Sequence, residues 1–326
     1  MNIVKISLST KYDSVPAHCQ IHCCDELIFD TVVDKDLDIT HETNQLNQFS
    51  VRITKTGKTV EVVKKNHEQS IMIKNINLNG IDLKVAEFGK FHVKNNIYVN
   101  DHTLQTNCLN LNGEWMLELP ARSIAGKIDL AKLKFRDPLE DSDIACFGCS
   151  QTYGVFLENY ESWPARLQEE TGKKIRNYGV RGSNINEITA LVDYYIENYK
   201  TDTILLYLPH TFRRQLELDG IIQQLGTLDP RNKDLVLHGE EHSIAVISDD
   251  LYRWLDNISQ NTKIYFGTYQ RDEYRLYEKT PLKKFMMPFL EGNDYPKASD
   301  DLHHGAEFNR VFAKKIKEFL KNSHRI

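Results

Sequence analysis

The sequence predicts an all-β domain followed by an α/β domain with a parallel sheet. Its 326 residues are about twice the length of an ordinary domain. Residues 1–120 alternate between apolar and polar with a period of two and show no lasting helical period. From residue 144 onward, apolar strand-like runs alternate with amphipathic helix-like segments. That order of elements is typical of a parallel sheet covered by helices on both faces.

The composition argues against several classes of protein. Hydrophobic residues make up 40% of the chain and charged residues 27%, so a disordered chain is not expected. A net charge of −5 gives no bulk attraction to nucleic acid, and we expect no such partner. No run approaches the ~18 apolar residues of a membrane helix, and the first residues alternate like a strand. We therefore expect no membrane partner, no signal peptide and a cytoplasmic or particle-associated protein.

The cysteines do not indicate disulfides or a metal centre. Six cysteines are too few for a disulfide framework in a chain of this length. Residues 18–24 group two histidines with three cysteines, but no second ligand pair follows at the 12–20 residues usual for structural zinc. A buried strand in which Cys and His alternate is the simpler interpretation. We expect no metal and no cofactor.

The N-terminal domain, residues 1–120, is expected to be a β-sandwich. Its predicted strands include residues 49–53, 59–63, 71–78, 81–85 and 115–119. The dipeptide at Asn79 and Gly80 is a strong signal for a two-residue hairpin. Many short strands with regular turns are typical of a sandwich. With no clustered catalytic side chains, this domain is expected to be either an accessory or a glycan-binding domain.

A linker is predicted over residues 121–142, and the α/β domain over 143–326. The linker lacks periodicity and contains the helix-breaking Pro138. In the second domain we expect strands at 144–147, 174–178, 203–208 and 263–268, and helices at 162–172, 184–199, 247–258 and 308–320. A short strand is also expected within residues 241–260, beside the helix at 247–258. Ser162 and Gly172 are the expected caps of the first of these helices.

The residues that follow the strands carry the candidate chemistry, because ligands bind at the carboxyl ends of parallel strands. Ser150 follows the first strand, and Gly182 lies in the turn after the second. Asp300 and His303 precede the last helix. A serine hydroxyl becomes a nucleophile when a base accepts its proton, and His303 is the candidate base, oriented by Asp300. The backbone N–H groups of Ser150 and Gly182 are the candidate oxyanion donors.

These segments resemble the SGNH/GDSL hydrolase family. GCSQTYG at residues 148–154 resembles its first block, NYGVRG at 177–182 its second, and DDLH at 300–303 its fifth. The resemblance covers about residues 143–322. It implies a flavodoxin-like three-layer domain, a Ser150–His303–Asp300 triad, and hydrolysis of esters, often acetyl groups on carbohydrate.

Two positions depart from the family pattern. Cys149 replaces the usual aspartate of the first block. The third block usually supplies an asparagine to the oxyanion hole, and here the loop after the third strand has none. Thr211 aligns with that asparagine and is expected as the third donor, with His210 as the alternative. Substrate contacts are expected from His210, Arg213 and Tyr153.

Several alternatives stay open at this point. Asp301 and His304 have the same spacing as Asp300 and His303 and could form the pair instead. The first functional hypothesis is a serine ester hydrolase, acting on acylated carbohydrate or a small ester. The alternative is a glycan-binding or particle-assembly protein whose hydrolase domain is degenerate. An acyltransferase would use the same triad. The sequence indicates no oligomeric state.

Overall fold

The computed structural model describes residues 2–43, 49–65, 67–94, 102–119, 128–211, 213–218, 221–225 and 233–323. Contacts divide the chain into two compact units. One comprises Met1–Arg122 and Asp234–Asp249, and the other comprises Ser123–Lys233 and Asp250–Ile326. Of the linker predicted over residues 121–142, residues 121–127 lie outside the described part of the chain.

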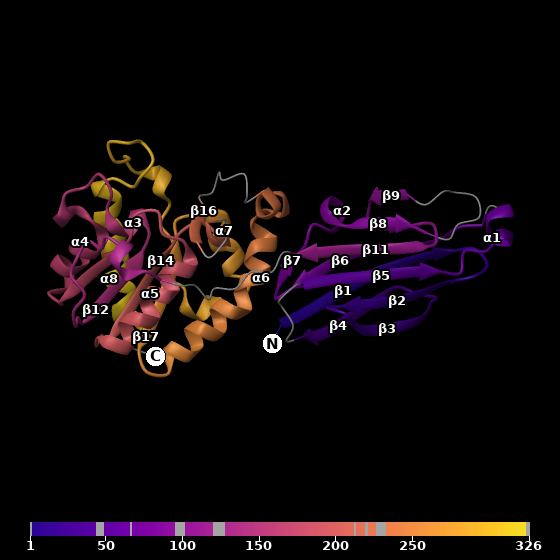
Figure 1. Cartoon of the computed structure of the whole chain (residues 1–326), viewed down its shortest axis with the longest axis horizontal. Helices are drawn as coiled ribbons and strands as arrows, with labels where there is room; N and C mark the ends of the chain where they lie inside the picture. The colour runs from indigo at the N-terminus through magenta and orange to yellow at the C-terminus, as the bar shows by residue number, and fades with distance from the viewer. Residues whose placement is uncertain are drawn as a thin grey trace. The chain divides into compact units, whose positions relative to one another are not determined.

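The first unit consists mainly of antiparallel β-strands (Figure 1). The strands are β1 (Asn2–Tyr12), β2 (Ala17–Cys23), β3 (Glu26–Val33), β4 (Leu37–Thr43), β5 (Phe49–Thr56), β6 (Gln69–Leu78), β7 (Ile81–Asp82), β8 (Lys90–Val93), β9 (His102–Gln105), β10 (Cys108–Leu109) and β11 (Gly113–Leu119), with short helices α1 (Val60–Lys64) and α2 (Val85–Phe88). They form two sheets, ordered β10-β6-β1-β4 with β7 beside β6, and β3-β2-β5-β11-β8-β9.

One face of each sheet is buried, as the alternating sequence predicts. In β1 the side chains of Val4, Ile6 and Leu8 are buried, and in β5 those of Val51 and Ile53 are buried. The two sheets also meet through a polar contact, in which buried Lys55 Nζ on β5 donates to Gln69 Oε1 on β6 at 3.1 Å. The expected sandwich is therefore confirmed.

Two local predictions in this unit had opposite outcomes. The hairpin at Asn79 and Gly80 is confirmed, because both residues have positive φ, 54° and 91°, as a type I′ turn requires. The strand predicted over residues 59–63 is wrong, since that segment forms α1. Gly57, at φ 97°, turns the chain out of β5, and the Thr59 side chain then accepts a hydrogen bond from Val62 N and caps a helical turn.

The second unit is a three-layer α/β fold. Its elements are β12 (Ile144–Gly148), α3 (Ser150–Tyr153), α4 (Trp163–Thr171), β13 (Ile175–Gly179), α5 (Ile185–Asn198), β14 (Thr203–Leu208), β15 (Arg214–Leu218), β16 (Ile221–Leu225), α6 (Lys233–Ser259, with Asp234–Asp249 in the first unit), β17 (Lys263–Thr268), α7 (Arg271–Tyr277) and α8 (Ala306–Ser323). The parallel sheet has the order β13-β12-β14-β17. This is the flavodoxin-like order 2-1-3-4, so the predicted fold class is confirmed.

Helices cover both faces of this sheet (Figure 1). On one face, Cys146 of β12 belongs to the same buried cluster as Trp163 of α4 and Phe312 of α8. On the other face, the ring of Phe147 lies 5.4 Å from that of Tyr195 on α5. Every residue of β12 and β14 is buried, which explains why these strands read as continuous apolar runs in the sequence.

The predicted mixture of a strand and a helix between residues 241 and 260 is wrong. Residues Lys233–Ser259 form the single helix α6. Ile247, Leu251, Leu255 and Ile258 are buried at helical spacing. Within the described residues, no helix is both long enough and apolar enough to cross a membrane.

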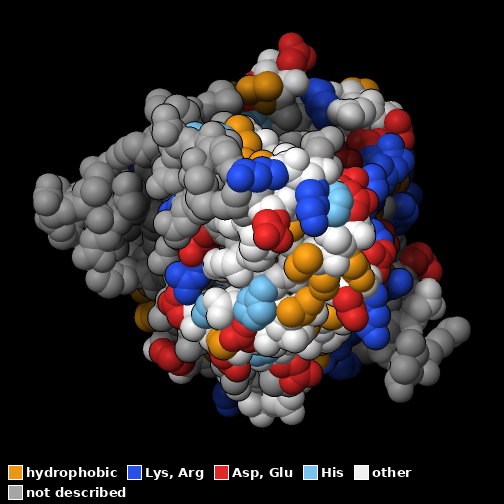
Figure 2. Space-filling model, turned by 90° about the vertical axis from the view of Figure 1, so that its right-hand side faces the viewer, with side chains coloured by type: hydrophobic (Ala, Val, Ile, Leu, Met, Phe, Trp, Pro, Cys, Tyr) orange, Lys and Arg blue, Asp and Glu red, His pale blue; other side chains and the backbone are white. Residues whose placement is uncertain are grey.

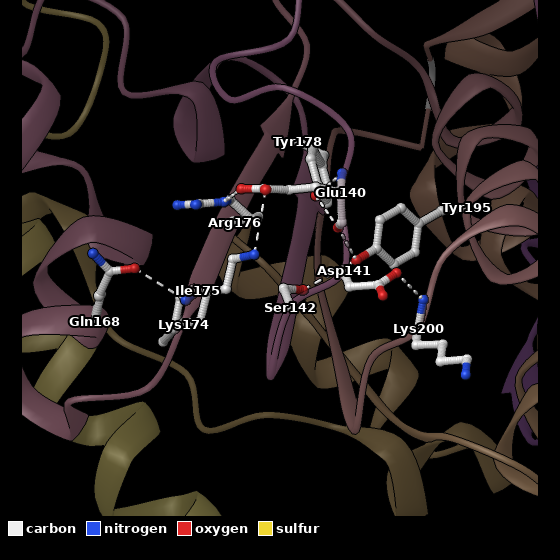
Figure 3. A network of polar contacts seen from close by, with 10 residues as sticks. All are labelled: Glu140, Asp141, Ser142, Gln168, Lys174, Ile175, Arg176, Tyr178, Tyr195 and Lys200. Atoms are coloured by element: carbon white, nitrogen blue, oxygen red, sulfur yellow. Dashed lines mark hydrogen bonds and ion pairs between the residues drawn. The ribbon is translucent and has the colours of Figure 1, made fainter.

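Polar contacts fasten the segment before β12 to the sheet (Figure 3). The Glu140 side chain forms ion pairs with Arg176 and Lys174. The backbone carbonyl of Glu140 accepts hydrogen bonds from the Tyr178 and Tyr195 hydroxyls at 2.9 and 2.8 Å. Asp141 accepts from the backbone of Lys200 at 2.9 Å. Most of these contacts lie near the amino ends of the strands, away from the edge that carries the candidate site.

The molecular surface in Figure 2 mixes side chains of both charge signs with small groups of hydrophobic ones. In the first unit, the large hydrophobic side chains that the structure describes as exposed are all aliphatic: Ile3, Val15, Leu27, Val32, Val63, Met72 and Leu104. The exposed aromatic side chains among the described residues, Phe156 and Tyr160, belong to the second unit.

Candidate active site

Ser150 begins helix α3 immediately beyond the carboxyl end of β12. The turn is tight because Gly148 has no side chain. A Cβ at that position would lie 2.1 Å from Thr152 Oγ1 and 2.6 Å from the carbonyl oxygen of Tyr207. The Ser150 residue is 8% exposed. Its hydroxyl is directed at Sγ of Cys149, 3.9 Å away.

The nucleophile turn packs closely on the neighbouring strand β13. A Cβ on Gly179 would come within 2.3 Å of the backbone nitrogen of Tyr153, so only glycine permits this approach. The Asn177 side chain donates to the carbonyl of Thr152 at 2.8 Å and accepts from Gly179 N at 3.0 Å. The first contact ties α3 to the sheet, and the second, within β13, orients the Asn177 side chain for it.

Gly182 lies in the turn after β13, beside the same strand end. Its φ of 76° is in the left-handed region that glycine adopts without strain. Val180 N and Ser183 Oγ both donate to the carbonyl of Gly148, at 2.9 and 3.3 Å, and hold this turn against the nucleophile turn. The role of the Ser150 and Gly182 N–H groups as oxyanion donors stays a prediction.

Asp300 and His303 form a hydrogen-bonded pair. Nδ1 of His303 lies 2.5 Å from Oδ2 of Asp300, while Oδ1 accepts from the backbone N–H groups of Leu302 and His303 at 3.2 and 3.1 Å. Burial alone would raise the pKa of Asp300. The hydrogen bonds from the His303 side chain and from the two N–H groups, together with the charge of His303, outweigh burial and lower that pKa to about 2.

The alternative pair, Asp301 with His304, does not form. The His304 ring stacks on Phe308 with centroids 3.7 Å apart, and neither ring nitrogen has a hydrogen-bond partner among the described residues. Burial, followed by the charges of Lys297 and His303, lowers the pKa of His304 to about 3. His304 is therefore a neutral buried ring at physiological pH.

Gln151 joins the histidine loop to the nucleophile turn. Its Oε1 accepts a hydrogen bond from His304 N at 3.1 Å, which links the neighbours of Ser150 and His303. Asn309 of α8 also holds the loop, since its Nδ2 donates to the carbonyls of His304 and Gly305. Sequence reasoning missed both residues. Only the position of Gln151 beside Ser150 could have suggested its role.

The structure brings the elements of the predicted triad to one edge without closing the Ser150–His303 contact. Among the described residues, the Ser150 hydroxyl forms a hydrogen bond with Cys149, and none joins it to His303. Catalytic hydrogen bonds are often long or misaligned without ligand. The roles of Ser150, His303 and Asp300 therefore stay predictions.

The loop after β14 is organised by the buried carboxylate of Glu273 on α7. Thr211 N and Thr211 Oγ1 both donate to Glu273 Oε1 at 2.8 Å. His210 Nδ1 lies 3.0 Å from the same oxygen, and Thr268 Oγ1 donates to Oε2 at 3.1 Å. Both donors of Thr211, the residue predicted as the third oxyanion donor, are thus engaged by Glu273. Sequence reasoning did not identify Glu273.

The other predicted substrate contacts have defined surroundings. The Tyr153 ring is contacted by the guanidinium groups of Arg136 and Arg181, 5.0 and 4.6 Å from its centroid. Arg213 N donates to the carbonyl of His210 at 3.0 Å. Their contact with substrate stays a prediction.

An aromatic residue that sequence reasoning missed lies beside His303. Phe156 is 60% exposed, and its ring centroid is 6.1 Å from that of His303. Its φ of 61° places a bulky residue in the left-handed region, an arrangement that costs energy and is often found at functional sites. Leu302, directly before His303, is 76% exposed.

A polar pocket of about 410 Å³ adjoins this edge. Its lining comprises Gln151, Tyr269, Gln270, Arg271, Asp272, Glu291, Gly292, Asn293, Lys297, Leu302 and His304. Two cationic and two anionic side chains balance one another there, and Arg271 pairs with Glu291 at 3.4 Å. Among the described residues, no group of three or more His, Cys, Asp or Glu side chains is arranged to hold a metal ion.

Comparison with protein-family models and with curated proteins finds no match. Solved structures do match. An acetyl xylan esterase from Butyrivibrio proteoclasticus is 9% identical, with 99% of this chain and 89% of that chain covered and a TM-score of 0.38. A family 2 carbohydrate esterase with a carbohydrate-binding domain, from Corynascus thermopiles (Myceliophthora fergusii), is 10% identical over 100% and 93%, with a TM-score of 0.37.

A lipolytic protein of the G-D-S-L family from Desulfitobacterium hafniense DCB-2 is 11% identical, over 54% of this chain and 97% of that chain, with a TM-score of 0.36. Identities near one residue in ten and TM-scores below 0.5 establish neither a family nor an activity. The chemistry of this chain is therefore inferred from the arrangement of Ser150, Asp300 and His303 at the carboxyl edge of its own parallel sheet.

Proposed function

We propose that the chain is a serine ester hydrolase that removes acetyl or other small acyl groups from carbohydrate. The hydrogen-bonded Asp300–His303 pair, joined through Gln151 to the turn that carries Ser150, is the observation that supports this most directly. A carboxylate that accepts a hydrogen bond from Nδ1 fixes the histidine tautomer, so that Nε2 can act as the base for a serine hydroxyl.

In the first half of the reaction, Ser150 Oγ attacks the ester carbonyl carbon while His303 Nε2 takes the hydroxyl proton. The bond to the sugar oxygen then breaks, and that proton passes to the departing sugar, leaving an acyl-serine. In the second half, water gives a proton to His303 and its oxygen attacks the acyl carbon. The free acid leaves as the proton returns to Ser150 Oγ.

The hydroxyl of Ser150 must turn for this to happen. It faces Sγ of Cys149 at 3.9 Å, a contact too long to be strong. Rotation about the Cα–Cβ bond would exchange this weak partner for the imidazole of His303. The backbone N–H groups of Ser150 and Gly182 would then donate to the oxyanion of each tetrahedral intermediate.

Two observations support a carbohydrate as the acyl carrier. The exposed aromatic rings of Phe156 and Tyr160 offer flat apolar surfaces on which a sugar ring can pack, and Phe156 is close to His303. The adjoining 410 Å³ pocket is polar with balanced charges, which suits a neutral ligand rich in hydroxyl groups better than a strongly charged one.

A glycan-binding or particle-assembly protein with an inactive hydrolase domain is the second candidate. Two observations favour it: the Ser150 hydroxyl bonds to Cys149, and Glu273 engages both donors of Thr211. An acyltransferase would use the proposed triad with a second alcohol in place of water.

Release of acetate by the full chain, from p-nitrophenyl acetate and from acetylated xylo-oligosaccharides, tests the proposal. We expect turnover that Ser150→Ala abolishes. Ser142→Ala is the matched control. Ser142 is about as buried as Ser150, but it lies before β12 and its hydroxyl forms a hydrogen bond with that of Tyr195. Turnover that survives in Ser150→Ala overturns the proposal. Binding of the oligosaccharides without any turnover supports the second candidate instead.

A further inference from the structure

Glu273 is a buried carboxylate that the proposed mechanism does not use. It is completely buried, at 0% exposure, although α7 begins in a charged surface segment. Burying a carboxylate is costly unless hydrogen bonds and an opposite charge compensate for the lost water. Here the compensation comes from two threonines, at 2.8 Å and 3.1 Å, and from His210 at 3.0 Å.

All four of these residues lie at the carboxyl ends of β14 and β17 or directly beyond them. Strand β14 is the neighbour of β12 on the side where the strand order reverses, with Gly148 opposite Tyr207. In this fold that reversal is the place where ligands bind. Ser150 follows Gly148 by two residues and His210 follows Tyr207 by three. The two residues therefore flank the same crevice from adjacent strands, which lie about 4.8 Å apart.

We propose that His210 is the third oxyanion donor and that Glu273 is the positioning residue that holds it for that task. This inference rests on the proposed ester hydrolase function. It assigns to an imidazole and its buried carboxylate the role that an asparagine has in the family which the sequence resembles. Thr211, which aligns with that asparagine, turns both of its donors toward Glu273 instead.

The contact with Glu273 determines which nitrogen of the His210 ring can donate a hydrogen bond to the substrate. Nδ1 lies 3.0 Å from the carboxylate oxygen, so Nε2, the ring nitrogen farther from Glu273, is the one through which His210 would donate to an oxyanion. For Nε2 to donate to an oxyanion while Nδ1 faces Glu273, the ring must carry protons on both nitrogens. The loop is held further by the Arg213 N–H, which donates to the carbonyl of His210.

Among the described residues, Tyr269 beyond β17 is influenced by Cys149 on the nucleophile turn, by Arg213 on the loop and by Glu273. Burial, followed by the influence of Cys149, raises the pKa of Tyr269 to about 12, so Tyr269 stays neutral in the working range. The hydroxyl of Tyr269 therefore changes no charge near His210 between pH 5 and 9.

Kinetics on p-nitrophenyl acetate test the assignment with four variants. We expect His210→Ala to lower kcat by ~10²–10³-fold with little change in KM, because the donor acts on the transition state. His210→Asn supplies an amide donor at the same place and should recover most of the loss. Glu273→Gln should lower kcat in the wild-type background but have little further effect in the His210→Asn background, since Asn does not depend on the carboxylate.

Thr268→Val is the matched control. It removes one hydrogen bond from Glu273 but leaves the His210 contact, so its kcat should stay within about threefold of the wild type. Long-range ¹H–¹⁵N spectra of the unaltered protein, with His210→Asn identifying the ring, provide a measurement that does not depend on the folding of Glu273→Gln. They should show a proton on Nδ1.

Three results would overturn the inference: an unchanged kcat in His210→Ala, an equal loss in His210→Asn and His210→Ala, or an unprotonated Nδ1. The two kinetic results require Ser150-dependent turnover in the wild type. Absence of that turnover would instead refute the proposed function, so the two failures are distinguishable.

Discussion

Asp300 binds His303 at two points, accepting from Nδ1 on one carboxylate oxygen at 2.5 Å and from the backbone N–H on the other at 3.1 Å. The ring is therefore fixed both in orientation and in its position on the chain. A carboxylate that serves only as a helix cap would contact the backbone alone. The double contact is what an orienting residue of a catalytic histidine needs.

Replacing Asp300 by Asn should separate these two contacts. The amide can keep the backbone hydrogen bonds while losing the negative charge that stabilises the imidazolium and selects the tautomer. We expect kcat on p-nitrophenyl acetate to fall by up to ~10⁴-fold, with KM within about threefold of the wild type. Asp301→Asn is the control, because Asp301 does not orient either histidine. Equal activity in the two variants would contradict the assignment of Asp300.

The acid side of the pH dependence of kcat/KM should show no protonation of Asp300. Because the pKa of Asp300 is lowered to about 2, this carboxylate stays ionised throughout the range above pH 3. The fall in activity on the acid side should therefore contain no step that belongs to this carboxylate. A second protonation between pH 4 and 6 that disappears in Asp300→Asn would show that the carboxylate titrates in the working range.

Gln151→Leu should weaken catalysis without removing any reacting group. It leaves the N–H of His304 without its acceptor and frees the loop that carries His303. Displacement of a catalytic group by 1 Å can cost ~10²-fold in rate, so we expect kcat to fall by roughly 10–100-fold. Gln151→Glu keeps an acceptor oxygen and should lose less. Thermal unfolding of both variants checks that the change is local, and equal kcat values for Leu and Glu would argue against this role.

The sequence predicted those parts of the fold and of the site that depend on residues close together in the chain. Strands β12 and β14 are continuous apolar runs because both of their faces are buried. The Asp300–His303 contact spans only three residues, so a spacing motif can reveal it. The hairpin at Asn79 and Gly80 is equally local, since these two residues adopt positive φ with little strain.

The parts that the sequence did not reveal depend on distant contacts. Gln151 meets His304 across 153 positions, and Thr211 meets Glu273 across 62. No spacing in the chain marks either pair. The strand prediction for residues 59–63 is wrong for another reason. The β-branched residues of this segment favour a strand, but the turn at Gly57 and the cap from Thr59 favour a helix more strongly.

Phe156→Asn should separate carbohydrate recognition from ester chemistry. Asn tolerates the left-handed φ of 61° better than Phe, so stability should not fall when the exposed ring is removed. We expect KM for acetylated xylo-oligosaccharides to rise about tenfold, as the loss of one packed aromatic surface allows. The kcat/KM for p-nitrophenyl acetate should stay within about twofold, since that ester carries no sugar.

Tyr160→Ala is the control for this prediction. Tyr160 is as exposed as Phe156, at 63%, but its ring is contacted by Arg166 at 5.5 Å. A smaller change in KM is expected for Tyr160→Ala than for Phe156→Asn. Parallel losses on the sugar ester and on p-nitrophenyl acetate would mean that Phe156 supports His303 and does not recognise the sugar.

The buried ring of His304 should make the protein sensitive to acid. Its pKa is lowered to about 3 in the folded chain, against an ordinary value of 6.5. Between pH 6.5 and 3 this histidine is protonated in the unfolded chain but stays neutral in the folded chain. The free energy of unfolding therefore falls as the pH falls from 6.5 toward 3. One such group contributes a slope of about 1.4 kcal/mol per pH unit, or about 2 kcal/mol at pH 5.

His304→Phe and His304→Leu should remove that contribution. Urea unfolding at a series of pH values between 7 and 4 measures it as the difference in slope between wild type and variant. The slope is a better measure than the stability itself, because a new side chain beside Gly292 also changes the packing. His67→Phe provides the matched control, since His67 bonds to Ser14 at an exposed site. Identical pH slopes in wild type and both His304 variants would show that the ring takes up its proton without unfolding, and hence that it is less enclosed than the stacking on Phe308 indicates.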